Sequence, residues 1–183
     1  GTVYPHLLAD ALTALALVLG LGADKDKALA ALKQFTPGGH RIQTVAVAKT
    51  SDGGTIRFVD DSKATNAHAA KASLNSFADK SVVWIAGGTD KGNDYEPLKA
   101  FAREKVHTLV CMGVDNRKLV ESFTGVVPEV ISTASLDEAM EAARRAARPG
   151  DAVLLSPACA SFDLFRNYEQ RGELFKKWVG EHC

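Results

Sequence analysis

Apolar residues in the first forty positions recur at helical spacing. Between residues 7 and 19 they return every three or four positions, which indicates one amphipathic helix, and Gly20 is placed to end it. Asp24 can cap a second helix, whose apolar residues between 28 and 35 form a single stripe. The run Thr36-Pro37-Gly38-Gly39 then breaks the pattern, so we expect a domain boundary near residue 38.

From residue 42 onward, short apolar runs alternate with helical segments. Ser51-Asp52-Gly53-Gly54 separates the first two runs and predicts a hairpin. The expected strands are residues 42–47, 55–59, 82–86, 108–112, 129–132 and 152–155. The expected helices are residues 66–76, 95–104, 116–123, 136–147 and 163–179. This alternation predicts an α/β, Rossmann-like fold, with a mostly parallel sheet of about six strands, an antiparallel edge hairpin and helices on both faces.

Charge and cysteine content narrow the function. The 183 residues carry 22 basic and 22 acidic side chains. The chain therefore lacks the excess of positive charge that would indicate nucleic acid or an anionic membrane as a partner. Three cysteines with no paired spacing argue against a disulfide framework or a bound metal and fit a reducing cytoplasm. Any anion-binding site must therefore be local.

Three polar loops directly follow expected strands. They cover residues 60–66, 87–94 and 156–161. Ligands of open α/β sheets bind outside the carboxyl ends of the strands, so we expect these loops to meet at one site. In the first loop, Lys63 and the free N–H groups of the following helix suit a phosphate or carboxylate. The alternative for this loop is a well-capped helix start with a surface salt bridge.

The other two loops carry candidates with their own alternatives. Lys91 follows a Gly-Gly pair that only loosely resembles a phosphate loop, and a flexible turn with a solvated lysine is an equal interpretation. Ser161 can cap the last helix or bind a ligand carboxylate. Cys159 is interpreted as a small packed residue, because no catalytic base stands beside it. The Tyr168 hydroxyl needs a partner and could reach the site.

The pattern alone does not fix the roles of two arginines and two histidines. Arg41 follows the Gly-Gly break and could clamp a phosphate, or be an ordinary linker residue. Arg171 is expected to be solvated or salt-bridged. His68 and His107 are expected at the surface or hydrogen-bonded, since no metal-ligand spacing is present.

Five segments together resemble one family, the D-glutamate-adding Mur ligases. They are Asp61-Ser62-Lys63-Ala64-Thr65-Asn66, Gly87-Gly88-Thr89-Asp90-Lys91-Gly92, the segment 155–163, His40-Arg41 and Asn167-Tyr168-Glu169-Gln170-Arg171-Gly172. The resemblance covers about residues 36–179. It implies that residues 1–38 are the helical tail of a central ATP-binding domain and that residues 39–183 are the C-terminal Rossmann-like ligase domain.

The resemblance also implies an activity. The family uses ATP and Mg²⁺ to phosphorylate UDP-N-acetylmuramoyl-L-alanine, and the amine of D-glutamate attacks the acyl phosphate to form a peptidoglycan precursor. A cytoplasmic, monomeric ligase is therefore expected. The nucleotide-binding Gly-Lys-Ser/Thr loop and the residues for magnesium and the muramoyl substrate are absent from this sequence, so residues 1–183 alone are expected to lack ligase activity.

Residue roles follow from the same resemblance. Lys91 and Thr65 would hold the α-carboxylate of D-glutamate. Ser161, the backbone around Phe162 and the residue at Tyr168 would hold its side-chain carboxylate.

The remaining roles concern the nucleotide and the closed site. Asp61 would bind the ATP ribose, Arg41 would approach the ATP phosphates, and Lys63 is the catalytic candidate that would steady the closed site. No residue is expected to hold a metal. The sequence departs from the family at Tyr168, where Phe is frequent, and at Leu7, where an Asn is usual. Only His6 matches the family there, and no adenine contact is assigned.

Two alternatives remain. One is a stand-alone Rossmann-like module that binds a nucleotide or an amino acid without catalysis. The other is a Mur-type ligase that adds a different amino acid.

Overall fold

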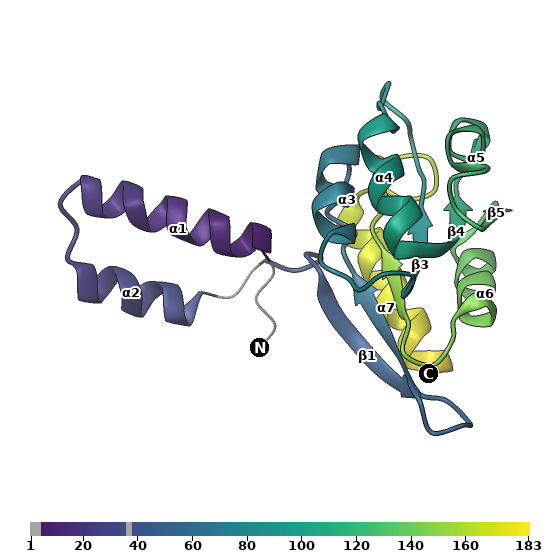
Figure 1. Cartoon of the computed structure of the whole chain (residues 1–183), viewed down its shortest axis with the longest axis horizontal. Helices are drawn as coiled ribbons and strands as arrows, with labels where there is room; N and C mark the ends of the chain where they lie inside the picture. The colour runs from purple at the N-terminus through teal and green to yellow at the C-terminus, as the bar shows by residue number, and fades with distance from the viewer. Residues whose placement is uncertain (1–4, 36–37) are drawn as a thin grey trace. The chain divides into compact units, whose positions relative to one another are not determined.

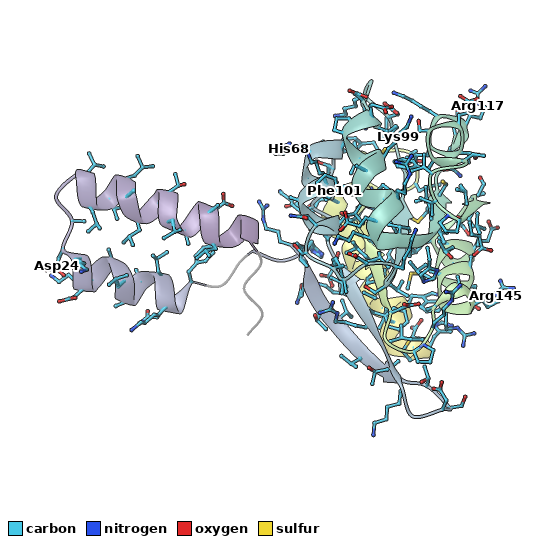
Figure 2. The ribbon with its side chains drawn as sticks, viewed as in Figure 1. Asp24, His68, Lys99, Phe101, Arg117 and Arg145 are labelled. Carbon is cyan, nitrogen blue, oxygen red and sulfur yellow. The ribbon has the colours of Figure 1, made fainter. Side chains whose placement is uncertain are left out.

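The computed structural model describes residues 5–35 and 38–183. The chain forms two compact units, Gly1–Gly38 and Gly39–Cys183. The first contains α1 (Pro5–Gly20) and α2 (Lys25–Gln34), which contact each other. Asp24 caps α2, because its carboxylate accepts a 2.9 Å hydrogen bond from the Lys27 amide, and Figure 2 shows it at the start of that helix. The side chains of His6 and Leu7 lie outside the described part.

The residues of the helical hairpin whose burial is described form no buried core. No residue of α2 is buried, and large apolar side chains of the hairpin stay exposed. These are Leu8, Leu12, Leu17, Val18, Leu21 and Phe35. Two helices with this much exposed apolar surface are unlike a free-standing domain, whose helices bury their apolar stripe.

The second unit is built on a six-stranded sheet in the order β1-β2-β6-β3-β4-β5 (Figure 1). Strands β1 and β2 are antiparallel, and the other neighbours are parallel. The strands are β1 (Gln43–Lys49), β2 (Thr55–Asp60), β3 (Val82–Ala86), β4 (Val106–Met112), β5 (Glu129–Thr133) and β6 (Ala152–Leu155). The expected α/β fold with an antiparallel edge hairpin is confirmed.

The helices of this unit cover both faces of the sheet. They are α3 (Ala67–Leu74), α4 (Glu96–Lys105), α5 (Arg117–Phe123), α6 (Leu136–Ala146) and α7 (Tyr168–His182). Alternate strand residues point to opposite faces. Val83 and Ile85 belong to the core cluster that includes residues of α6 and α7. Trp84 lies between these two residues in the sequence, and its ring packs edge-on against Phe123 of α5, with 5.3 Å between the ring centres. The fully buried β3 and β4 explain the continuous apolar runs in the sequence.

One predicted helix boundary is wrong. The last helix was expected from residue 163, but α7 begins at Tyr168. Asn167 caps it by accepting a 2.8 Å hydrogen bond from the Gln170 amide, and the Gln170 side chain accepts one from the Arg166 amide. Asp163 instead accepts hydrogen bonds from Val114 and Leu164. Residues 163–167 therefore extend the loop after β6 rather than the helix.

Within the described residues, no helix has the length and apolar character needed to cross a membrane.

Candidate functional site

A cavity of about 400 Å³ opens where the loops after β2, β3 and β6 meet. These strands are neighbours and run in parallel, so the loops that follow them share one edge of the sheet. The cavity is lined by Lys63, Thr65, Lys91, Ala160, Ser161, Phe162, Asn167, Tyr168 and Glu169. Six of the eight predicted site residues are among them. Arg41 and Asp61 are not part of the lining.

Two ammonium groups give the cavity its charge. Lys63 Nζ lies 3.8 Å from the centre of the Tyr168 ring, and Lys91 Nζ lies 5.4 Å from that of Phe162. Within the described residues, neither ammonium group forms an ion pair with a carboxylate. Cations resting on aromatic faces keep their charge available, because the ring offers attraction without neutralising them. The arrangement suits a ligand that carries two negative groups.

The loop after β2 holds the segment before β1. Asp60 Oδ2 lies 2.6 Å from His40 Nδ1, and the Lys63 amide donates to the His40 carbonyl at 3.0 Å. The Ile42 amide donates to Asp61 at 3.2 Å. Asn66, rather than Ser62 or Thr65, caps α3. The carboxylates of Asp60 and Asp61 thus hold residues 40–42 in place.

Residues 40–42 are strained at both ends. His40 has φ 63° and Ile42 has φ 44°, values that a β-branched residue rarely adopts. Such conformations persist only when surrounding contacts impose them, and they cluster at functional sites. Gly172 contributes, because a Cβ at that position would overlap the His40 ring. The result is an exposed Arg41 held between two fixed neighbours.

Asp61 itself is almost fully buried. Its carboxylate accepts hydrogen bonds from the hydroxyls of Ser73 and Ser156 as well as from Ile42. Burial raises the pKa of Asp61 to about 6, and these hydrogen bonds oppose the rise. A carboxylate offers about four acceptor positions, so three described donors leave one for a further hydroxyl.

The raised pKa of Asp61 predicts a pH dependence of stability. The folded state holds the Asp61 proton more tightly than the unfolded chain does, so this stabilisation is complete below about pH 4 and is lost as the pH rises through about 6. Asp61→Asn removes the titration, and serine hydroxyls can turn to accept from the amide. Between pH 4 and 7, the free energy of unfolding of the variant should therefore gain about 2–3 kcal/mol relative to that of the original chain. Urea unfolding of both chains between pH 4 and 7 measures this difference. If the free energies of unfolding of the two chains changed with pH by the same amount, the prediction would be contradicted.

The Gly-Gly pair after β3 serves packing between loops. A Cβ at Gly88 would overlap the Ala160 carbonyl, and one at Gly87 would overlap the backbone of Met112. Thr89 donates to Ala160 and forms a β-bridge with it. Gly87 therefore allows close approach to the end of β4, and Gly88 lets the Lys91 loop lie against the loop after β6, where both loops contribute to the cavity.

The carboxylate of Asp90 fixes the turn that carries Lys91. It accepts hydrogen bonds from the amides of Gly92 at 2.6 Å and Asn93 at 2.8 Å, and from the Tyr95 hydroxyl at 3.0 Å. Lys118 of α5 adds an ion pair at 3.0 Å. These contacts hold the pKa of Asp90 below its usual range despite partial burial.

Arg171 corrects an expectation. It is neither solvated nor salt-bridged but fully buried, and its guanidinium donates to the Ser62 hydroxyl, the Ser62 carbonyl and the Cys159 carbonyl. Burial lowers the pKa of Arg171 to about 10, so it stays charged at neutral pH. One side chain thereby ties the loop after β2 to the loop after β6.

Other expectations can now be compared with the structure. Cys159 is a packed residue, because it is buried, lies 3.0 Å from the Tyr95 hydroxyl, and has a pKa raised by burial. His107 is buried and hydrogen-bonded to Asp151 and Thr108, and His68 is exposed. The interpretation of Ser161 as a helix cap is wrong, since Asn167 caps α7.

Sequence reasoning missed three cavity residues, Ala160, Asn167 and Glu169. All three lie inside the segments 155–163 and 167–172 that were quoted for their resemblance, so the signal was present.

Comparison with known proteins places this site in a family. The family described as "Mur ligase, glutamate ligase domain" matches residues 40–159, which cover the loops after β2 and β3 and the beginning of the loop after β6. The chain belongs to the Mur ligase family.

Relatives within the Mur ligase family cover the whole chain. A UDP-N-acetylmuramoylalanine–D-glutamate ligase from Bifidobacterium adolescentis is 63% identical over 100% of this chain and 40% of that protein. One from Streptomyces coelicolor is 42% identical over 97% of the chain and 38% of that protein. The chain thus spans about 40% of the length of the curated relatives it matches.

Solved structures share the fold at low identity. A UDP-N-acetylmuramate–alanine ligase from Thermotoga maritima superposes with a TM-score of 0.68 at 17% identity, covering 100% of this chain and 39% of that one. A folylpolyglutamate synthase/dihydrofolate synthase from Yersinia pestis gives 0.64 at 19% identity, covering 94% and 39%.

Proposed function

We propose that this chain is the C-terminal part of an ATP-dependent ligase that adds D-glutamate to UDP-N-acetylmuramoyl-L-alanine in the cytoplasm. The observation that carries the proposal is the cavity, in which two ammonium groups without a carboxylate partner among the described residues lie near three hydroxyl-bearing residues, Thr65, Ser161 and Tyr168. Relatives described as D-glutamate ligases, up to 63% identical over the whole chain, support the choice of substrate.

The cavity residues fit a dicarboxylic amino acid. Lys91 and Thr65 would bind the α-carboxylate, and Ser161, the backbone around Phe162 and Tyr168 would bind the side-chain carboxylate. Charge-assisted contacts from ammonium groups, hydroxyls and backbone amides are the interactions that carboxylates favour. Lys63 would steady the closed site beside the reacting groups.

ATP would approach from the segment 40–42. The exposed guanidinium of Arg41 is held between strained neighbours and suits phosphate oxygens. The acceptor position left on Asp61 suits a ribose hydroxyl. ATP supplies the phosphoryl group that activates the acceptor carboxylate. We assign most ATP contacts and the Mg²⁺ to the part of the relatives that this chain does not span.

The alternatives differ in what they predict. A ligase for another amino acid would share the fold, as the alanine ligase of Thermotoga maritima does at 17% identity. A stand-alone binding module would not require a longer protein, whereas the relatives extend well beyond this chain.

Assays of the full-length enzyme test the proposal. With ATP, Mg²⁺ and UDP-N-acetylmuramoyl-L-alanine, phosphate release should depend on D-glutamate. Faster turnover with L-lysine or meso-diaminopimelate would overturn the substrate assignment. Residues 1–183 alone should show no turnover. Measurable ligase activity of that chain would contradict the assignment of most ATP contacts to the part of the relatives that it does not span.

Asp90 gives a prediction about the Lys91 turn. Asp90→Ala removes an acceptor of two backbone amides and one hydroxyl, so the turn loosens and Lys91 loses its placement. Misplacing a binding group by even a small distance is costly, so the KM for D-glutamate should rise about tenfold while the KM for ATP stays constant. Steady-state kinetics of the full-length enzyme measures both constants.

Two variants serve as controls for Asp90. Asp90→Asn keeps an acceptor for the turn and should restore most of the affinity. Asp94→Ala, in the same loop, removes only an acceptor for the Glu96 amide and should have a smaller effect. An equal loss in all three variants would point to general unfolding of the loop.

A further inference from the structure

Glu169 is the single carboxylate among the described residues that line the cavity. It lies in the first turn of α7, directly after Tyr168, and its side chain is exposed. Lys63 and Lys91 line the same cavity, and neither forms an ion pair with Glu169 or with another described carboxylate. Within the described residues, the Glu169 carboxylate therefore has no direct ion pair with either lysine.

The charges of the cavity form a pattern of two positive groups and one negative group. A dicarboxylic amino acid in solution carries the complementary pattern, two carboxylates and one ammonium. We propose that Glu169 binds the ammonium group of the incoming amino acid and thereby orients the nitrogen while the lysines and hydroxyls hold the two carboxylates. This inference rests on the proposed function and adds a substrate contact to it.

The surroundings of Glu169 suit a lasting negative charge. The nearby Tyr168 side chain and the ammonium group of Lys63 hold the pKa of Glu169 below its usual range. A carboxylate whose pKa lies below its usual range stays charged at neutral pH, as binding of an ammonium group requires. Because the Glu169 side chain is exposed and lines the cavity, an entering ammonium group can reach it.

Glutarate provides a probe that separates this contact from the rest of the site. It has both carboxylates of glutamate but no amino group. In the full-length enzyme, Glu169→Gln should raise the KM for D-glutamate about two- to fivefold, the size expected for an exposed ion pair. The inhibition constant of glutarate, competing against D-glutamate, should not rise, because glutarate makes no contact that the variant has lost.

Controls distinguish this role from a structural one. Glu181→Gln, on the same helix and paired only with Lys177, should change neither constant, and Glu169→Asp should recover part of the affinity. The inference is overturned by an unchanged KM in Glu169→Gln, by equal rises of the KM and the glutarate constant, or by glutarate that fails to compete in the unaltered enzyme. A full-length enzyme that does not use D-glutamate would instead overturn the proposed function.

Discussion

Replacing Lys91 with alanine should raise the KM for D-glutamate about 10- to 100-fold in the full-length enzyme. The ammonium group is held by the Asp90 turn against Phe162 and has no carboxylate partner among the described residues, so its charge is free for the substrate. Loss of a hydrogen bond to a charged group costs about 1.5–3 kcal/mol, and each 1.4 kcal/mol is a factor of ten in affinity. Steady-state kinetics with each substrate varied in turn measures the effect.

The KM for ATP should stay constant in Lys91→Ala, because the segment that approaches the nucleotide is elsewhere. Lys99→Ala is the matched control. Lys99, labelled in Figure 2, lies on α4, pairs with Glu96 and takes no part in the cavity lining. A KM for D-glutamate that is unchanged in Lys91→Ala, or raised equally in Lys99→Ala, would remove Lys91 from the site.

Arg171→Met should lower the free energy of unfolding of the chain by about 3–5 kcal/mol. Methionine fills much of the space but cannot donate, so the carbonyls of Ser62 and Cys159 lose their described donor in a fully buried place. Each buried polar group left unpaired costs about 1–3 kcal/mol, and the methionine fills the guanidinium space incompletely. Urea unfolding at pH 7 measures the change.

Arg166→Met is the control for that prediction, because Arg166 is exposed and lies in the loop just before α7. Surface substitutions of this kind usually stay within about 0.5 kcal/mol. Arg171→Lys should fall between the two, since lysine keeps the charge but loses the forked geometry. Equal stability of Arg171→Met and Arg166→Met would show that the two loops are held together by other contacts.

Local pattern was enough for most of the fold. Parallel-sheet strands are apolar on both faces, and loops and caps use a small set of residues, so β3 was predicted at its observed bounds and the cap at Asp24 was correct. The start of α7 was missed because Asp163 resembles a helix start. Its carboxylate is instead used by Val114, 49 positions away, which no local pattern reveals.

The cavity was predictable in composition but not in shape. Parallel strands bring their following loops to one edge, so loops rich in lysine and hydroxyls could be grouped from sequence order alone. The strand order, with β6 between β2 and β3, then decided that the loop after β6 lies between the other two. That placement brings Ser161 and Glu169 to the lysines.

The sequence by itself determined the elements, the three polar loops and the family to which their residues point, because these depend on periodicity and on short motifs. Only the tertiary structure decided which polar residues face the cavity. Arg171 was expected to be solvated or salt-bridged, and Asp61 was expected to bind the ATP ribose, yet both side chains are buried, because their partners come from distant segments. Ser62 lies 109 positions from Arg171, and the fold alone closes that distance.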